Sequence, residues 1–301
     1  MKNLLKILPL IPLCLACGSD SEDDMTTSTG NAIVFDARID NTRAVAGITD
    51  IQTDGFKVWG GFGTTTVFNG ENIVLGSDNI HTTDKKWTFN TYNFYAVYPT
   101  TVNAAYTPPT TFTINNYNVK DNQGADLMIA TATSHVYPDN GEAVGLYFRH
   151  ALAQVEFVGK SLSAIAPVLL KKITVYGDGA PATATYNEST QAWTANNTTT
   201  QSNPLLTADN GGSGWDLTST GTTVVNGLMV FPKGNADNVY VDLTTFDGKT
   251  DKTQTLTIPA TEWENGRIYR YTFTLDPENN LTITLKIKKW NELDSSYNIT
   301  F

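Results

Sequence analysis

The sequence has almost no cysteine. Of its 301 residues, two are cysteines, Cys14 and Cys17, and both lie near the N-terminus. A disulfide framework and a cysteine-based metal or thiol site are therefore excluded from the rest of the chain. Charged residues are also scarce, at 17% of the total, and they leave a net charge of −10. This acidic balance argues against nucleic acid as a partner, because nucleic-acid binding needs a basic surface.

Motifs that carry enzyme chemistry are also missing. The three histidines, His81, His135 and His150, are isolated from one another. No HExxH, GxSxG or phosphate-binding glycine loop follows a predicted strand. We therefore expect no enzyme activity, no catalytic residue, no cofactor and no metal site, and we expect His150 to make a structural hydrogen bond. An extracellular hydrolase would need two carboxylates facing each other across a cleft, which the sequence alone does not reveal.

The apolar run at the N-terminus is too short to cross a bilayer. Residues 4–13 follow a basic start and contain two prolines, which is typical of a signal peptide. Residues 13–18, LCLACG, resemble a lipobox, in which Cys17 carries diacylglycerol once residues 1–16 are removed. Residues 17–30 then form an acidic, flexible tether. The alternatives are a secretory peptide with incidental cysteines and a solvated linker without a sorting role.

The rest of the sequence alternates apolar and polar residues with period two, and it lacks a sustained helical stripe. This pattern predicts an all-β protein. In the first half, strands are predicted at residues 31–40, 56–59, 87–89, 92–98 and 126–130. Asn69-Gly70 predicts the turn of a hairpin.

The run from Leu146 to Val158 changes the phase of its alternation. Such a change predicts a bulge or a strand that moves between sheets. We place the domain boundary near Gly159-Lys160, which gives one β-sandwich domain at 31–160 and a second at 161–301. The second domain ends on two alternating runs, 269–275 and 281–287, separated by a turn at 277–280.

Tryptophan side chains could form a binding surface. We expect four of the tryptophans to pack in the core or between strands instead, because aromatic pairs stabilise sheets. These four are Trp87, Trp193, Trp215 and Trp263. The alternative is a monomeric surface glycan-binding lipoprotein in which exposed aromatic rings stack on sugars.

Several segments together resemble the fimbrillin family of Bacteroidetes, the subunits of type V pili. The similar segments are the leader with acidic residues 18–24, residues 31–44, GFKVW at 55–59, YNFYAVYP at 92–99, DLMIA at 126–130, LYFRHALA at 146–153 and the last long strand ending at Lys289-Trp290. The resemblance covers nearly the whole chain. It implies two tandem transthyretin-like β-sandwich domains, and a structural role in a fimbria at the cell outer membrane.

The resemblance also implies how such a subunit assembles. A trypsin-like protease cuts after an arginine, which on this chain falls between Arg43 and Ala44, with Arg38 less favoured because it lies within a strand. The first strand, 31–40, then leaves, and a tail like 291–301 of a neighbour replaces it. The apolar side chains of the leaving strand are Ile33, Phe35, Ala37 and Ile39. Those of the donor tail are Tyr297, Ile299 and Phe301.

Elementary energetics agree with this scheme. Each larger apolar side chain of the leaving strand covers surface worth roughly 1.5–3 kcal/mol, so its loss leaves a groove that captures a matching strand. The partners implied are other pilus subunits in a homo- or heteropolymer, the outer membrane through the lipid on Cys17, and a host or bacterial surface receptor. The alternatives are that Arg43 is an uncut surface residue and that the tail is an ordinary last strand of its own domain.

Overall fold

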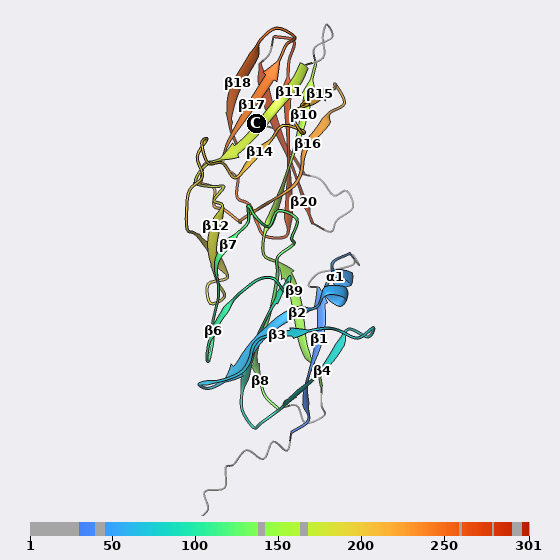
Figure 1. Ribbon diagram of the computed structural model, residues 1–301, viewed down its shortest axis with the longest axis vertical. Helices are drawn as coiled ribbons and strands as arrows, with labels where there is room; N and C mark the ends of the chain where they lie inside the picture. Colours follow the sequence, from blue (N-terminus) through green and yellow to red (C-terminus); the bar gives the residue numbers. More distant parts are fainter. Residues whose placement is uncertain are drawn as a thin grey trace, which may run out of the picture.

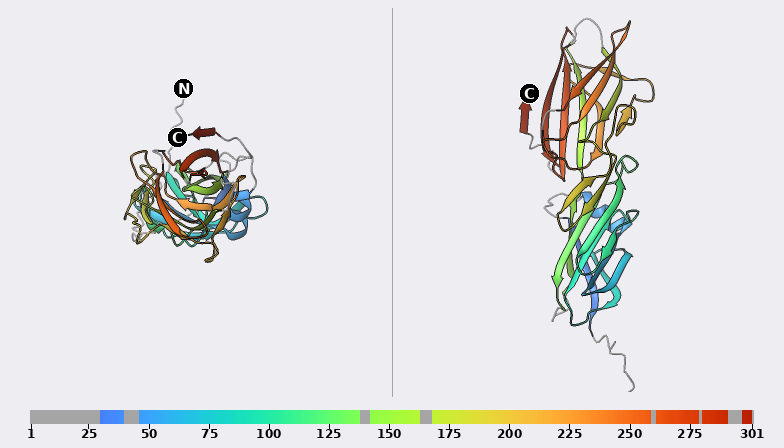
Figure 2. Two further views of the ribbon diagram at one scale, coloured as in Figure 1. Left: turned by 90° about the horizontal axis from the view of Figure 1, so that it is seen from above. Right: turned by 90° about the vertical axis from the view of Figure 1, so that its left-hand side faces the viewer.

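The computed structural model describes residues 30–39, 46–137, 142–162, 168–258, 261–278, 280–290 and 297–300. Strands dominate these residues, which also contain the short helix α1 (Ala46–Asp54). The molecule is elongated, with two groups of sheets stacked along its long axis (Figures 1 and 2). None of the helical residues described forms a helix long and apolar enough to cross a membrane. The expectation of an all-β fold is confirmed.

A seven-stranded sheet forms the lower half of Figure 1. Across the sheet its strands are β3 (Thr65–Ile73), β2 (Phe56–Phe62), β5 (Tyr92–Tyr98), β8 (Met128–His135), β9 (Val144–His150), β1 (Ala32–Ile39) and β4 (Ile80–Lys86). The rings of Phe35 on β1 and Phe68 on β3 lie 5.4 Å apart, although four strands separate β1 from β3 in this order. The sheet therefore curls around one hydrophobic core.

A four-stranded sheet covers the other face of the central strands. Its strands are β13 (Ala192–Ala195), β12 (Thr183–Asn187), β7 (Thr111–Asn118) and β6 (Ala105–Thr107). The ring of Phe112 on β7 stacks on Tyr95 of β5, with 4.9 Å between ring centroids, and lies 5.6 Å from the ring of Trp59 on β2. Because β7 belongs to the first half of the chain and β12 to the second, their pairing joins the two halves.

Two five-stranded sheets form the upper half of Figure 1. One has the order β16 (Thr222–Val230), β10 (Ala153–Ser161), β19 (Arg267–Leu275), β20 (Leu281–Lys289) and β21 (Tyr297–Thr300). The other has the order β14 (Leu206–Ala208), β11 (Val168–Tyr176), β17 (Tyr240–Phe246) and β18 (Asp251–Thr257), and β15 (Trp215–Leu217) also pairs with β11. Phe157 and Tyr271 of the first sheet share a core with Ile173 and Leu243 of the second, so the sheets pack as a β-sandwich.

The phase change within Leu146–Val158 has the predicted structural cause. β9 ends in the seven-stranded sheet, whereas β10 pairs with β16 and β19 in the upper half. Ala151 and Leu152, between the two strands, are buried. The chain therefore moves from one sheet to another at these residues, and β10 continues through Gly159-Lys160. The division into domains at 31–160 and 161–301 stays a prediction.

Two local predictions are wrong. Asn69-Gly70 lies inside β3, and the β2–β3 hairpin turns at residues 63–64 instead. Gly70 has a φ of 78° and sits where the β2–β3 register shifts, because a bulge needs the conformation that glycine adopts easily. Residues 87–89 form a loop rather than a strand. The amide of Thr88 donates to the hydroxyl of Tyr92 at 3.2 Å, which ties this loop to the start of β5.

The two runs near the C-terminus form a hairpin, as predicted. β19 and β20 pair antiparallel without a register shift, from Arg267–Lys289 to Leu275–Leu281. The amide of Asp276 donates to the carbonyl of Asn280 at 3.0 Å across the turn. Residues 277–278 form a turn, and Asn279 lies outside the described residues.

Candidate functional site

β1 is an interior strand held by neighbours that are distant in sequence. It pairs in parallel with β9 on one edge and antiparallel with β4 on the other. The hydroxyl of Thr83 on β4 also donates to the carbonyl of Ile33 at 2.9 Å. Because both edges of β1 are paired, its removal would leave two rows of backbone donors and acceptors without partners.

One face of β1 fills the core of the seven-stranded sheet. Ile33, Phe35 and Ala37 are completely buried, and Ile39 is 7% exposed. The Phe35 ring meets the rings of Phe68 and Phe94 edge-on, each at 5.4 Å. The four residues named from the sequence as the leaving strand therefore share one face and one core.

The other face of β1 carries Asp36 and Arg38 after Ala32 and Val34, and Arg38 is one of the two arginines considered for cleavage. Arg38 Nη2 lies 2.6 Å from Asp36 Oδ2, and the Arg38 side chain is mostly exposed. The hydrogen bond to Asp36, together with its charge, raises the pKa of Arg38. Arg38 therefore lies within a paired strand, whereas Arg43 and Ala44, the favoured cut, lie outside the described residues. Cys17 lies outside them as well.

The predicted donor tail is partly described. β21 pairs antiparallel with β20, with Tyr297 opposite Ile287 and Ile299 opposite Leu285. This backbone pairing places the tail at the edge of the sheet that also contains β19 and β10. Phe301 and the side chains of Tyr297 and Ile299 lie outside the described part of the chain.

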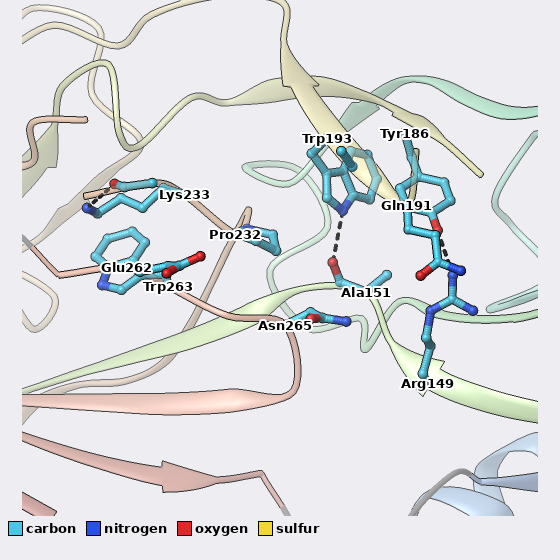
Figure 3. Close-up of a pocket in the computed structure, with 12 residues that line it drawn as sticks. Arg149, Ala151, Tyr186, Gln191, Trp193, Pro232, Lys233, Glu262, Trp263 and Asn265 are labelled. Carbon is cyan, nitrogen blue, oxygen red and sulfur yellow. Dashed lines mark hydrogen bonds between the residues drawn. The ribbon is translucent and has the colours of Figure 1, made fainter. Parts of the chain in front are cut away.

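A cleft of about 330 Å³ lies where the halves of the chain meet (Figure 3). Arg149 of β9 and Tyr186 of β12 line one side of it, and the Tyr186 hydroxyl accepts a hydrogen bond from Arg149 Nη2 at 2.7 Å. The indole N–H of Trp193 donates to the carbonyl of Ala151 at 2.9 Å. These polar groups therefore bind each other across the junction of the two halves.

The opposite side of the cleft is organised around Lys233. Its ammonium donates to the carbonyls of Gly234, Asp237 and Thr261 at 3.1, 3.3 and 2.8 Å, and it lies 5.1 Å from the ring centroid of Trp263. Burial lowers the pKa of Lys233. Through these hydrogen bonds Lys233 holds the loops that contain Gly234, Asp237 and Thr261 together.

Within the described residues, no group of three or more His, Cys, Asp or Glu side chains could hold a metal ion.

The three histidines lie apart in the structure. His150 Nδ1 lies 3.0 Å from Asp126 Oδ1, which confirms the predicted structural hydrogen bond. The His150 ring also stacks on Trp290, with 4.7 Å between centroids and 1° between ring planes. His81 lies on β4 and His135 ends β8, where burial lowers the pKa of His135.

The tryptophans mostly serve packing, as expected. Trp87 and Trp263 are 2% and 1% exposed, which confirms the prediction of core packing for both. Trp193 and Trp215 are half-buried against the core. The Trp193 ring lies 4.8 Å from the ring of Phe231. These four tryptophans therefore do not present the coplanar, exposed platform that the glycan-binding alternative needs.

Sequence reasoning did not identify the polar network around Glu188. The carboxylate accepts from Thr131 Oγ1 at 2.7 Å, Tyr186 Oη at 2.6 Å and Arg149 Nη2 at 3.0 Å. A buried carboxylate needs such partners, but its burial is a product of the fold. The sequence carries no signal that links Glu188 to Thr131 or Arg149.

Comparison with known proteins gives a consistent result. No curated protein matches the chain. Solved structures of candidate cell adhesion proteins from Bacteroides eggerthii, Bacteroides ovatus and Bacteroides uniformis share the fold, with TM-scores of 0.56, 0.52 and 0.50 and identities of 13%, 17% and 16%. The alignments cover 87%, 88% and 88% of this chain and 97%, 99% and 99% of those chains.

A family model adds sequence evidence to this likeness of fold. The model described as fimbrillin-like matches residues 42–290. The matched region begins after β1 and ends at Trp290, so it contains every strand of the two groups of sheets except β1 and β21. Because the match spans well over half of the sequence, this chain belongs to the fimbrillin-like family.

Proposed function

We propose that this protein is a structural subunit of a cell-surface pilus that supports adhesion, exported as a lipoprotein through Cys17. Membership of the fimbrillin-like family and a fold shared with cell adhesion candidates support a structural role rather than an enzymatic one. The observation that carries the proposal is β1: an interior strand whose apolar face fills a core, and which precedes the family match at residue 42.

In this proposal, proteolysis after Arg43 frees β1 from the rest of the chain. The strand would leave a groove lined by β9 and β4, with Phe68 and Phe94 uncovered where the ring of Phe35 had packed. Exposing that surface costs about 25 cal/mol for each Å² of apolar area, in addition to the unpaired backbone groups. A groove of this kind favours capture of a new strand with the same alternation.

The tail 291–301 is the proposed replacement strand. Fully extended, it reaches about 36 Å, which exceeds the roughly 26 Å of the eight-residue β1. Tyr297, Ile299 and Phe301 alternate as the apolar residues of β1 do. Before donation, the tail has to leave the edge of β20, with which residues 297–300 pair.

Such a contact is head to tail, because the groove and the tail are different surfaces of the same chain. A heterologous contact that does not close into a ring propagates into a filament. Other pilus subunits are therefore the proposed partners, with the outer membrane as the site of anchorage before cleavage. The assembled fimbria would bind a receptor on a host or bacterial surface.

The test is limited trypsin treatment of the purified full-length protein. We expect N-terminal sequencing to find a new terminus at Ala44, and SDS gels of unheated samples to show ladders of polymers. Arg43→Gln should remove both the cut and the ladders. Arg38→Gln is the matched control, because this arginine lies nearby on the solvent face of β1 and should leave both unchanged.

Cleavage after Arg43 that leaves only monomers would contradict strand replacement. Ladders that form equally in Arg43→Gln would show that polymerisation does not depend on release of β1. In either case the family assignment and the fold would stand, and the assembly mechanism would fall.

A further inference from the structure

An aromatic tip projects from the lower end of the seven-stranded sheet. Phe89, in the loop between β4 and β5, is 90% exposed, and Val136, directly after β8, is 62% exposed. The rings of Phe89 and Tyr137 lie 5.7 Å apart, edge to face. We define Phe89, Val136 and the partly buried Tyr137, which also packs against the core, as the tip. Large apolar side chains exposed in this way mark surfaces that meet a membrane or another protein.

The segments 88–92 and 134–137, which carry the tip, contain no Asp, Glu, Lys or Arg, and the carboxylates of the β8–β9 loop, Asp139 and Glu142, follow Tyr137 in sequence. Residues 88–92 read TFNTY and residues 134–137 read SHVY, in a protein whose net charge is −10. His135 is the one titratable base in these two segments, and burial lowers its pKa, so it is neutral at pH 7. The tip is therefore uncharged as well as apolar, which keeps the cost of leaving bulk water low.

The chain enters the described structure beside this tip. The amide of Trp87 donates to the carbonyl of Asn31 at 3.1 Å, and Ala32 pairs with Lys86. Gly30 packs so closely that a Cβ on it would lie 2.1 Å from the carbonyl oxygen of Trp87. The segment that leads back to Cys17 therefore emerges two residues from Phe89.

The length of that segment limits how far the tip can be from the lipid. From Cys17 to Gly30 the backbone spans at most about 45 Å when fully extended, and less in any relaxed conformation. A lipid on Cys17 would thus hold the tip, rather than the upper sandwich, close to the membrane. Because the tether, residues 17–30, joins the described structure beside the tip, we favour the lipid surface over a second copy of the chain as the partner of the tip.

We propose that the tip inserts into the head-group region of the outer membrane leaflet while the subunit is tethered by its lipid. This inference rests on the lipoprotein anchorage in the proposed function. At a lipid–water boundary the Phe ring is buried among apolar groups, whereas the Tyr ring buries its apolar body and leaves its hydroxyl in water. This contact orients the subunit so that its long axis points outward from the membrane surface.

The test uses a single fluorophore on the full-length, lipidated protein. In the proposed lipoprotein Cys17 is acylated and Cys14 is removed with residues 1–16, so an introduced cysteine would be the unique free thiol. Asn90→Cys places an environment-sensitive nitrobenzoxadiazole label next to Phe89. Thr250→Cys in the β17–β18 turn is the matched control, because it is exposed and lies in the upper half.

Each labelled protein is reconstituted into vesicles of phosphatidylethanolamine and phosphatidylglycerol. We expect a blue shift of the Asn90 label and its quenching by spin-labelled lipid, with neither effect at Thr250. Phe89→Ser combined with Val136→Ser should abolish the shift, although the protein still floats with the vesicles. Both side chains are exposed, so these changes leave the core intact.

Three results would overturn the inference. A protein that floats with vesicles while its Asn90 label remains in water would show that the tip does not touch lipid, although the anchor is real. A blue shift that depends on protein concentration without vesicles would assign the tip to another copy of the chain. Failure to float at all would remove the lipid anchor itself, and this inference with it.

Discussion

Arg149 and Glu188 form an ion pair between the two halves of the chain, with 3.0 Å between Arg149 Nη2 and Glu188 Oε2. Arg149 lies on β9 of the seven-stranded sheet, and Glu188 follows β12 of the four-stranded sheet. The Glu188 side chain is 6% exposed, so water screens this pair poorly. The pair and its hydrogen bonds hold the four-stranded sheet against the seven-stranded sheet.

Replacing Glu188 should therefore destabilise the whole fold. We expect Glu188→Ala to lower the free energy of unfolding by about 3 kcal/mol, because it leaves Arg149 and the hydroxyl of Tyr186 without their acceptor. Urea denaturation followed by tryptophan fluorescence measures this. Glu264→Ala is the control, because its ion pair with Arg267 is exposed and contributes less than about 1 kcal/mol. Equal effects of the two changes would contradict a special role for Glu188.

Truncation of Phe35 should weaken the attachment of β1. Phe35→Ala removes a completely buried ring that packs against Phe68 and Phe94, and such changes cost about 3–5 kcal/mol. Asp36→Ala, on the solvent face of the same strand, should cost less than about 1 kcal/mol. Urea midpoints of the two variants test this difference. Similar midpoints would mean that β1 contributes little to the core.

Deletion of residues 291–301 should separate folding from strand donation. The truncated protein should keep the secondary structure seen by circular dichroism, because β19 and β20 still pair along their full length. After trypsin cleavage it should cap polymers of the complete protein and should form none by itself. Unfolding of the truncated chain would show instead that the tail belongs to its own core.

Stability should fall at high pH. Burial raises the pKa of Tyr95, Tyr98 and Tyr117 to about 12. Between pH 10 and 12 the unfolded chain has lost these phenolic protons while the folded chain keeps them, so the free energy of unfolding decreases as pH rises. Below about pH 9 these groups are protonated in both states and have no effect.

Two measurements check this pH dependence. Phenolate absorbance of the native protein should show a group of tyrosines that titrates well above pH 10. The urea midpoint should be lower at pH 11 than at pH 9. Native tyrosines that all titrate near pH 10, with an unchanged midpoint, would contradict the expectation.

The sequence was most informative where local pattern alone sets the structure. Alternation with period two predicted the strands around Phe35, and it predicted the hairpin of β19 and β20 with its turn after Asp276. The phase change before Val155 correctly indicated a strand that changes sheets. The hairpin turn predicted at Asn69-Gly70 was wrong, because a bulge and a hairpin turn both need a residue that tolerates positive φ.

The choice of partner strands depended on the tertiary structure. Alternation predicts which side chains of a strand share a face, but it does not predict which other strand pairs with that strand. β1 pairs with β4 and β9, and β7 pairs with β12, across long stretches of sequence. The β7–β12 pairing brings Glu188 to Arg149, and the β1–β4 pairing places Phe89 beside the start of β1. The all-β class and the alternating strands could be predicted from the sequence, because they follow from local sterics and hydrophobicity. Only the tertiary structure decided the neighbours of β1, the junction of the two halves and the exposed tip, because these depend on the packing of distant strands around shared cores.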